Sequence, residues 1–306
     1  MNSQPLVSVP VITYNSADYI IEGLESIKDQ TYQNIELIIS DDCSTDNTVE
    51  VCRKWLEENK DRFVRTLLVE TGKNTGVAGN CNRAIRPCEG EWIKMLSGDD
   101  KFLPYTIEGY MEYVSAHPEV NICFAKLHFF GDDNEVVAKT ENMYKKLYVE
   151  IERLEKQKER YLNHHFIPGT GLFYKKSLWN NVGGFDEKYP FCEEYPFNLY
   201  VLEAGESIYF IDRELYQYNV RYGSLSYWGL PAYRNFFDFW KFFKDYRFLR
   251  LIKQGQILEA IDQYTVYNKM IAVDYDKSSY IGKIFAKILR LLSPLAYIHK
   301  FVRSNG

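Results

Sequence analysis

The chain has 306 residues, of which 46% are hydrophobic and 26% charged, and its formal net charge is −5 at pH 7. This balance is ordinary for a globular protein with one large domain and an appendage, and it excludes a disordered or fibrous chain. An acidic chain also lacks the basic footprint that displaces counterions from nucleic acid, so we expect no nucleic-acid partner.

Strands and helices alternate in the first sixty residues. Residues 7–12 form a β-branched run, and apolar residues then recur with helical spacing over residues 20–27. Residues 35–40 form a second apolar strand, and a helix is predicted over residues 47–58. This β-α-β-α order predicts an α/β fold with a mostly parallel central sheet flanked by helices.

Further strands are predicted at residues 66–69, 92–96, 121–127 and 207–211. The predicted sheet thus extends over residues 6–215. Pro10 is an exception within the first strand, because proline cannot donate to a sheet ladder and normally lies at an edge, a strand start or a bulge. We therefore expect the first strand to be irregular.

A strongly charged segment follows at residues 143–163. On a helix, one face of this segment carries Leu147, Ile151 and Leu154. The favoured interpretation is a solvated helix with one packed stripe. The alternative is a contribution to an acceptor site, because the segment directly precedes the GTG sequence at residues 169–171.

The last quarter of the chain differs in composition. After residue 230 glycines and turns become rare, and aromatic residues crowd the sequence NFFDFWKFFKDYRF. We place a boundary near Gly229, with a main α/β domain at residues 1–229 and a helical extension at residues 230–306.

Within the extension, residues 281–303 are predicted to form a basic amphipathic helix. Lys283, Lys287 and Arg290 share one face, and apolar side chains occupy the opposite one. Such a helix lies in the headgroup layer of an anionic membrane or packs on the main domain, and the sequence leaves both open. No run approaches the roughly 18 apolar residues of a membrane span, and the N-terminus lacks the pattern of a secretory signal. We therefore expect a cytoplasmic protein, with peripheral contact to the inner face of the cell membrane as the alternative.

Adjacent acidic residues follow two of the predicted strands. Asp41 and Asp42 come directly after the strand at residues 35–40, and Asp99 and Asp100 follow the strand at residues 92–96. In an open parallel sheet, ligands bind outside the carboxyl ends of the strands. The first pair is therefore placed to accept hydrogen bonds from a base or ribose, and the alternative is that it caps the following helix.

The second acidic pair indicates a metal site. Adjacent carboxylates such as Asp99 and Asp100 repel one another unless a cation or hydrogen-bond donors compensate them. Mg²⁺ or Mn²⁺ is commonly held by one or two carboxylates together with phosphate oxygens. The alternative is a simple acidic turn.

These motifs resemble the N-terminal signature of family 2 glycosyltransferases, GT-A fold enzymes that use nucleotide sugars. The resemblance rests on four strings: YN at residues 14–15, SI-x-x-QT at residues 26–31, DD-x-S-x-D-x-T at residues 41–48 and LSGDD at residues 96–100. It implies a GT-A catalytic domain at residues 1–229, and it is far more specific than any single acidic pair.

The resemblance also assigns expected roles to these residues. It implies that Asp42 contacts the base of the donor nucleotide, with Tyr14 and Asn15 near the same pocket. Asp99 would face the ribose or the metal, and Asp100 would bind the metal, Mn²⁺ or Mg²⁺.

The stretch KNTGVAGNCNRAI looks like the family's loop and helix beside the nucleotide, and Asn74, Gly76 and Asn82 fit that pattern. The family commonly has arginine where this chain has Cys81, so one expected donor is absent. It also often has an acid where this chain has Ser97, which leaves the metal mainly on Asp100.

The far side of the site resembles the family's GGFDE and ED segment. In GGFDEKYPFCEEYPFNLYV the equivalent of the catalytic base is Glu194, beside Glu193, with glutamate in place of the usual aspartate. The alternative is that both are first-turn acids stabilised by the helix dipole. Arg221 occupies the position of a histidine that usually lies near the donor diphosphate, and its guanidinium suits phosphate.

The resemblance therefore implies an inverting transfer in which Glu194 takes the proton of the acceptor hydroxyl. It implies a nucleotide diphosphate donor, with UDP as the favoured carrier. The transferred group would be a hexosyl or N-acetylhexosaminyl group. The acceptor would be a glycan, which is lipid-linked in one alternative. The family's commonest setting is bacterial capsule, lipopolysaccharide or exopolysaccharide synthesis. Two other functions remain open. One is a nucleotidyltransferase, although the segment VITYNSADY lacks the glycine-rich triphosphate loop of such enzymes. The other is a catalytically silent nucleotide-sugar binding module.

Overall fold

The computed structural model describes residues 4–163, 167–220, 238, 241–253, 255–258 and 260–261. The chain divides into two compact units, Met1–Ser224 and Leu225–Gly306. The predicted boundary near Gly229 and the predicted helix at residues 281–303 lie outside the described residues.

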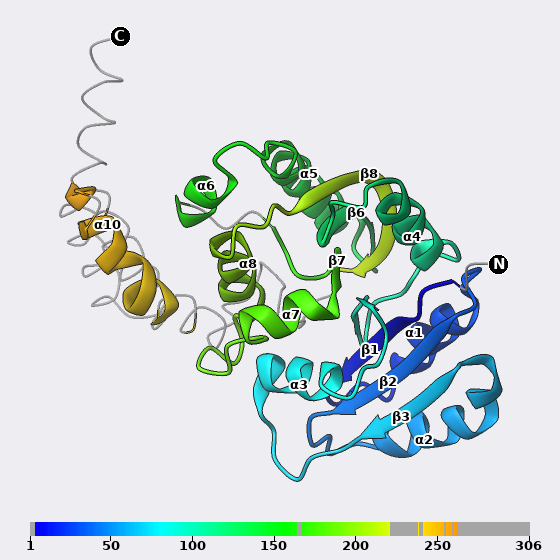
Figure 1. Ribbon diagram of the computed structural model, residues 1–306. Helices are drawn as coiled ribbons and strands as arrows, with labels where there is room; N and C mark the ends of the chain where they lie inside the picture. The colour runs from blue at the N-terminus through cyan, green and yellow to red at the C-terminus, as the bar shows by residue number, and fades with distance from the viewer. Residues whose placement is uncertain are drawn as a thin grey trace. The chain divides into compact units, whose positions relative to one another are not determined.

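The first unit is built around one sheet (Figure 1). Its strands are β1 Val7–Thr13, β2 Ile35–Asp41, β3 Arg65–Val69, β4 Trp92–Ile93, β5 Leu96–Ser97, β6 Ile122–Phe130, β7 Leu172–Lys175 and β8 Tyr209–Asn219. They lie in the order β3-β2-β1-β4-β7-β6-β8, and β5 also pairs with β1. The β7 strand runs antiparallel to β4 and β6, whereas the other pairs are parallel. The expected mostly parallel α/β sheet is thus confirmed, with one reversed strand that the sequence did not predict.

Helices flank this sheet. They are α1 Ile20–Lys28, α2 Thr48–Asn59, α3 Gly76–Ile85, α4 Thr106–Ala116, α5 Asn134–Ile151, α6 Gln157–Asn163, α7 Lys176–Val182 and α8 Glu194–Glu203, with a 3-10 turn at Lys60–Arg62. Because right-handed crossovers connect β1, β2 and β3, α1 and α2 pack together on one face, and α3 covers β1 and β2 from the other (Figure 1). The core is centred on β1 and β2, in which almost every residue is buried.

The expected irregularity at Pro10 does not appear in β1 itself, which is continuous and pairs with β2 in an unbroken register, but the pairing on its other side is interrupted. The backbone oxygen of Ser8 accepts a hydrogen bond from the Lys94 N–H at 3.0 Å, toward the β4 side of β1. Backbone groups of alternate residues point to the same side of a strand, so the Pro10 nitrogen faces that side as well and has no N–H to donate. There the single strand predicted at residues 92–96 is divided into β4 and β5.

Two segments differ from the sequence prediction. The charged helix begins at Asn134, where the Asp133 side chain accepts N–H groups of the first turn. Of the predicted stripe, Ile151 is buried, but Leu147 is only half-buried and Leu154 is exposed; the other buried residues are Thr140, Tyr144 and Tyr148. The last strand, β8, continues to Asn219, because its parallel pairing with β6 resumes after a β-bulge. The sequence prediction ended that strand at residue 211, where charged residues begin.

In the second unit, most of the described residues are helical. They comprise a π-helix at Phe243–Phe248 and α10 at Leu249–Lys253, and Leu251 and Ala260 form a small buried cluster. Across the described residues of both units, the structure contains no helix that is long and apolar enough to span a membrane.

Candidate active site

The predicted nucleotide and metal residues gather at one edge of the sheet. Tyr14 and Asn15 follow β1, Asp42 follows β2, and Asp99 and Asp100 follow β5. All three strands are parallel to one another, so their carboxyl ends share this edge. The structure therefore brings these five residues to the region that the sequence predicted.

The loops after β1 and β2 are tied together by side chains. Asn15 has a left-handed backbone, with φ at 50°, and its N–H donates to the Ser44 hydroxyl at 2.8 Å. Its side-chain oxygen accepts the Thr45 N–H at 2.8 Å. Tyr14, beside it, is 48% exposed. Asn15 thus fixes the shape of the loop, and Tyr14 presents an accessible ring at the site.

Asp42 is buried and accepts hydrogen bonds from the start of α3. Its carboxylate receives the N–H of Thr75 at 2.9 Å and the N–H of Gly76 at 2.9 Å, as well as the Thr75 hydroxyl at 2.7 Å. It also forms an ion pair with Arg83 at 2.8 Å. The alternative that Asp42 caps the helix after β2 is not observed, because its partners belong to α3, where backbone N–H groups attract an anion.

Arg83 is a site residue that the sequence reasoning missed. Its guanidinium bonds the Ser40 hydroxyl at 3.0 Å and the Thr75 hydroxyl at 3.1 Å in addition to Asp42. Cys81, which stands where the family commonly has arginine, is buried in α3. A positive charge is therefore present at the carboxyl end of β2, and it comes from Arg83, two positions after Cys81.

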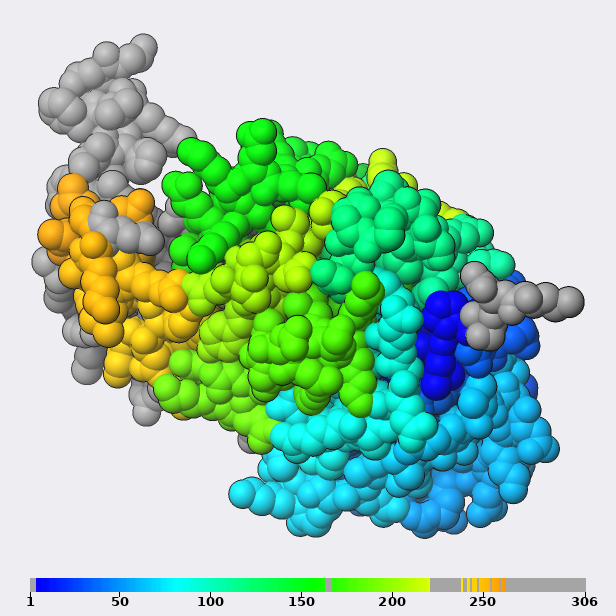
Figure 2. Space-filling model, in the orientation of Figure 1, coloured from blue at the N-terminus to red at the C-terminus, as the bar shows by residue number. Residues whose placement is uncertain are grey.

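The two asparagines predicted beside the nucleotide occupy different environments. Asn74 is exposed, and its side-chain oxygen accepts the Gly76 N–H at 3.2 Å. Asn82 is buried and forms a pair of hydrogen bonds with the backbone of Phe185, at 2.8 and 2.9 Å, and a third with Glu187 at 2.8 Å. Asn82 therefore joins α3 to the loop that leads to α8, and the two segments adjoin on the visible surface (Figure 2).

Asp100 is a buried carboxylate. One of its oxygens accepts the Tyr216 hydroxyl at 2.8 Å, and the other accepts the Asn219 N–H at 2.8 Å. Burial, followed by the charge of Asp99, raises the pKa of Asp100 well above its ordinary value. Because β8 supplies both donors, this long strand completes the acidic site, and Tyr216 and Asn219 are two further residues that the sequence did not indicate.

Glu194 begins α8, and the neighbouring chain packs closely against it. A Cβ atom placed on Gly169 would lie 3.1 Å from the Cβ of Glu194. Burial, followed by the charges of Glu193 and Glu194, raises the pKa of the Cys81 thiol, so both glutamates lie near α3. The structure thus places the predicted base beside the helix that also contacts Asp42.

Tyr144 packs against Phe129 of β6, with ring centroids 4.8 Å apart. This α5 side chain is buried, and burial is the main reason why its pKa is raised. The charges of Glu194 and Asp100 both raise the pKa of Tyr144 further.

The donor set limits how a cation could be held. The described residues contain no group of three or more histidine, cysteine, aspartate or glutamate side chains that could hold a metal ion. Asp99 and Asp100 are adjacent, and one or two carboxylates suffice when phosphate oxygens complete the coordination. The residues therefore fit a cation that is shared with a diphosphate. Arg221 lies outside the described residues.

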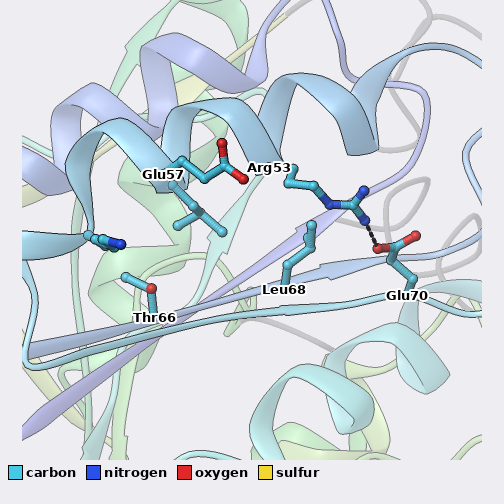
Figure 3. Close-up of a pocket in the computed structure, with 7 residues that line it drawn as sticks. Arg53, Glu57, Thr66, Leu68 and Glu70 are labelled. Atoms are coloured by element: carbon cyan, nitrogen blue, oxygen red, sulfur yellow. Dashed lines mark hydrogen bonds and ion pairs between the residues drawn. The ribbon is translucent and has the colours of Figure 1, made fainter.

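A pocket of about 250 Å³ lies elsewhere, between α2 and β3. Figure 3 shows Arg53 and Glu57 of α2 facing Thr66 and Leu68 of β3 and the adjoining Glu70. The lining of this pocket includes none of the residues predicted for the site. We assign it no part in the reaction.

Comparison with known proteins identifies the family. The family described as Glycosyl transferase family 2 matches residues 8–182. The chain belongs to glycosyl transferase family 2. A relative, the glycosyltransferase GlyG of Streptococcus pneumoniae, is 31% identical to it over 225 residues, which are 72% of each chain. This family 2 protein is therefore a glycosyltransferase, as the sequence motifs predicted.

Solved structures confirm the expected GT-A fold of this glycosyltransferase. The mannosyltransferase PcManGT of Pyrobaculum calidifontis, in complex with GDP-Man and Mn²⁺, has a TM-score of 0.62 and 19% identity, covering 96% of this chain and 82% of that one. Staphylococcus aureus TarS 1-349, in complex with UDP-GlcNAc, has a TM-score of 0.55 and 16% identity, covering 96% and 91%. At these identities the likeness concerns the fold alone.

Proposed function

We propose that this glycosyltransferase transfers a hexosyl or N-acetylhexosaminyl group from a UDP-sugar to a hydroxyl of a glycan acceptor, with inversion, in bacterial surface polysaccharide synthesis. The observation that carries the proposal is the gathering of Asp42, Asp99 and Asp100 at the shared carboxyl edge of the parallel strands β1, β2 and β5. The UDP-GlcNAc complex of TarS supports the choice of donor.

On the donor side, Asp100 and Asp99 would hold Mn²⁺ or Mg²⁺. The Mn²⁺ in the PcManGT complex supports this assignment. The cation would neutralise charge on the departing diphosphate.

The nucleotide would bind around the ends of β1 and β2. Tyr14 offers an exposed ring for the base, and Asn15 and Asn74 shape the two loops. Asp42 would meet the base at the start of α3. Asn82 would act by fixing α3, and Arg221 would meet the diphosphate.

On the acceptor side, Glu194 would take the proton of the attacking hydroxyl. A carboxylate within hydrogen-bond reach is sufficient for this role. Gly169 leaves room for the Glu194 side chain, because any larger residue there would approach the Glu194 Cβ. Acceptor and donor would then meet between Glu194 and the acidic pair Asp99 and Asp100.

The test measures UDP release and glycan product from the full chain with UDP-sugars, with and without Mn²⁺. We expect Asp100→Ala to abolish Mn²⁺-dependent turnover, and Glu194→Gln to lower transfer by at least ~100-fold while UDP binding persists. Asp212→Ala, which removes an exposed partner of Lys126, is the matched control and should retain activity.

Each alternative function has its own signature in this assay. Binding of UDP-sugar without any turnover would identify a silent binding module, and pyrophosphate release from UTP and a sugar phosphate would identify a nucleotidyltransferase. Undiminished transfer by Glu194→Gln would show that another group is the base.

A further inference from the structure

Lys94 is a fully buried lysine at the break between β4 and β5. Its ammonium donates to the backbone oxygens of Thr170 at 2.7 Å and Leu172 at 3.1 Å. The aromatic ring of Tyr216 has its centroid 4.4 Å from the same nitrogen, and that of Tyr110 lies 5.3 Å away. A buried charge costs free energy unless it is paired. The hydrogen-bond partners of Lys94 are neutral, so its burial must be offset by what it holds in place.

The backbone that Lys94 holds is the segment at residues 169–172. Tyr110 donates its hydroxyl to the Gly171 oxygen at 2.7 Å, so three successive carbonyl oxygens of this segment accept hydrogen bonds from buried side chains. The other end of the segment faces α8, because Gly169 packs against the Cβ of Glu194. Lys94 and Tyr110 therefore fix, through one short piece of backbone, the surface on which Glu194 rests.

On its other side, Lys94 adjoins the acidic part of the site. Tyr216, whose ring lies over the ammonium, donates its hydroxyl to Asp100 at 2.8 Å. Burial lowers the pKa of Lys94 to about 7, and the charges of Cys123 and then Asp100 oppose this effect. Lys94 is thus connected to Asp100 through Tyr216 and to Glu194 through residues 169–172.

We propose that Lys94 is a positioning residue for sugar transfer, which holds residues 169–172 so that Glu194 is oriented toward the acceptor hydroxyl. The proposal rests on the proposed function. A positioning residue acts through the group that it orients, so its effect should disappear when that group is removed.

The experiment is a double-mutant cycle in the full chain with Lys94→Met and Glu194→Gln. A displacement of about 1 Å in a reacting group can cost ~100-fold in rate, so we expect Lys94→Met to lower kcat by ~10- to 100-fold. The affinity for UDP with Mn²⁺, measured by calorimetry, should change by less than about 3-fold, because the nucleotide residues are untouched. In the Glu194→Gln background, Lys94→Met should lower the remaining activity by less than about 3-fold.

Lys176→Met is the matched control. Lys176 also donates to two backbone oxygens, those of Arg86 and Cys88, but at the far end of β7. It should leave kcat within about 2-fold of the wild type, as is usual for substitutions away from a site. If Lys94→Met does not fold, Tyr110→Phe tests the same segment by removing the hydrogen bond to Gly171.

The outcomes separate the two proposals. Equal kcat values for Lys94→Met and Lys176→Met, or effects of Lys94→Met and Glu194→Gln that multiply fully, would overturn the positioning role. Full activity in Glu194→Gln would overturn the assignment of the base, and the positioning role would fall with it.

Discussion

Replacement of Arg83 by methionine tests how the nucleotide side of the site is held. Arg83 and Asp42 form an ion pair at 2.8 Å, with side-chain exposures of 16% and 3%. Removal of one partner from a buried pair usually costs about 3–5 kcal/mol, because it leaves an uncompensated charge. The Thr75 and Gly76 donors remain on Asp42, so we expect the lower end of this range, about 3 kcal/mol.

This cost is measurable as a change in thermal stability. For a domain of about 150–250 residues, each kcal/mol lowers the unfolding midpoint by about 2–4 °C, so Arg83→Met should lower it by about 6–12 °C. Circular dichroism of the nucleotide-free full chain provides the measurement. Arg53→Met is the control: it breaks an ion pair with Glu70 whose side chains are 54% and 46% exposed, and such pairs contribute about 0–1 kcal/mol. Equal midpoints for the two variants would refute the conclusion that Asp42 depends on Arg83.

Three further predictions concern stability. Gly76→Ala should lower the free energy of unfolding in urea by about 2 kcal/mol or more, because Gly76 has φ at +79° and a Cβ there would lie 2.7 Å from the Cβ of Pro190. Gly183→Ala is the control: Gly183 has φ at +86° but open space around it, so the cost should be only about 1–2 kcal/mol. Similar costs for the two variants would contradict the close contact at Gly76. Asn82→Ala should lower the free energy of unfolding by about 2–4 kcal/mol through its lost buried hydrogen bonds, and an unchanged urea midpoint would be inconsistent with them. Burial lowers the pKa of Lys94 from 10.5 to about 7, so between pH 7 and pH 10.5 the unfolded chain binds more protons than the folded one. The wild type should therefore gain stability relative to Lys94→Met as the pH rises from about 7 to 9. Parallel curves of unfolding free energy against pH for the two proteins would exclude this linkage.

Local patterns in the sequence were sufficient for much of the fold. The apolar runs of β1 and β2 and the acidic pairs that follow β2 and β5 could be read directly, because each lies within a few residues of chain. The GT-A fold and the family followed from the same strings, and both are confirmed. The roles of the individual site residues remain predictions.

Other features depend on contacts between distant segments. The four residues of β7 show no periodicity of their own, and the strand forms because β4 and β6 supply partners on both sides. Arg83 reaches Asp42 only because α3 lies over the end of β2, so its position in the sequence carries no signal. Tyr216 and Asn219 lie beyond the strand predicted at residues 207–211, and their contact with Asp100 spans more than a hundred residues.

The reversed β7 strand has a consequence for synthesis of the chain on the ribosome. A nascent chain that has emerged only through β6 contains the two strands that flank β7, but not β7 itself. Both strands then present unpaired backbone groups, which are templates for association with other chains. Lys175 must emerge from the ribosome before β7 can pair with both strands, so nascent chains whose emerged part ends between residues 131 and 171 should be the ones that engage chaperones most strongly.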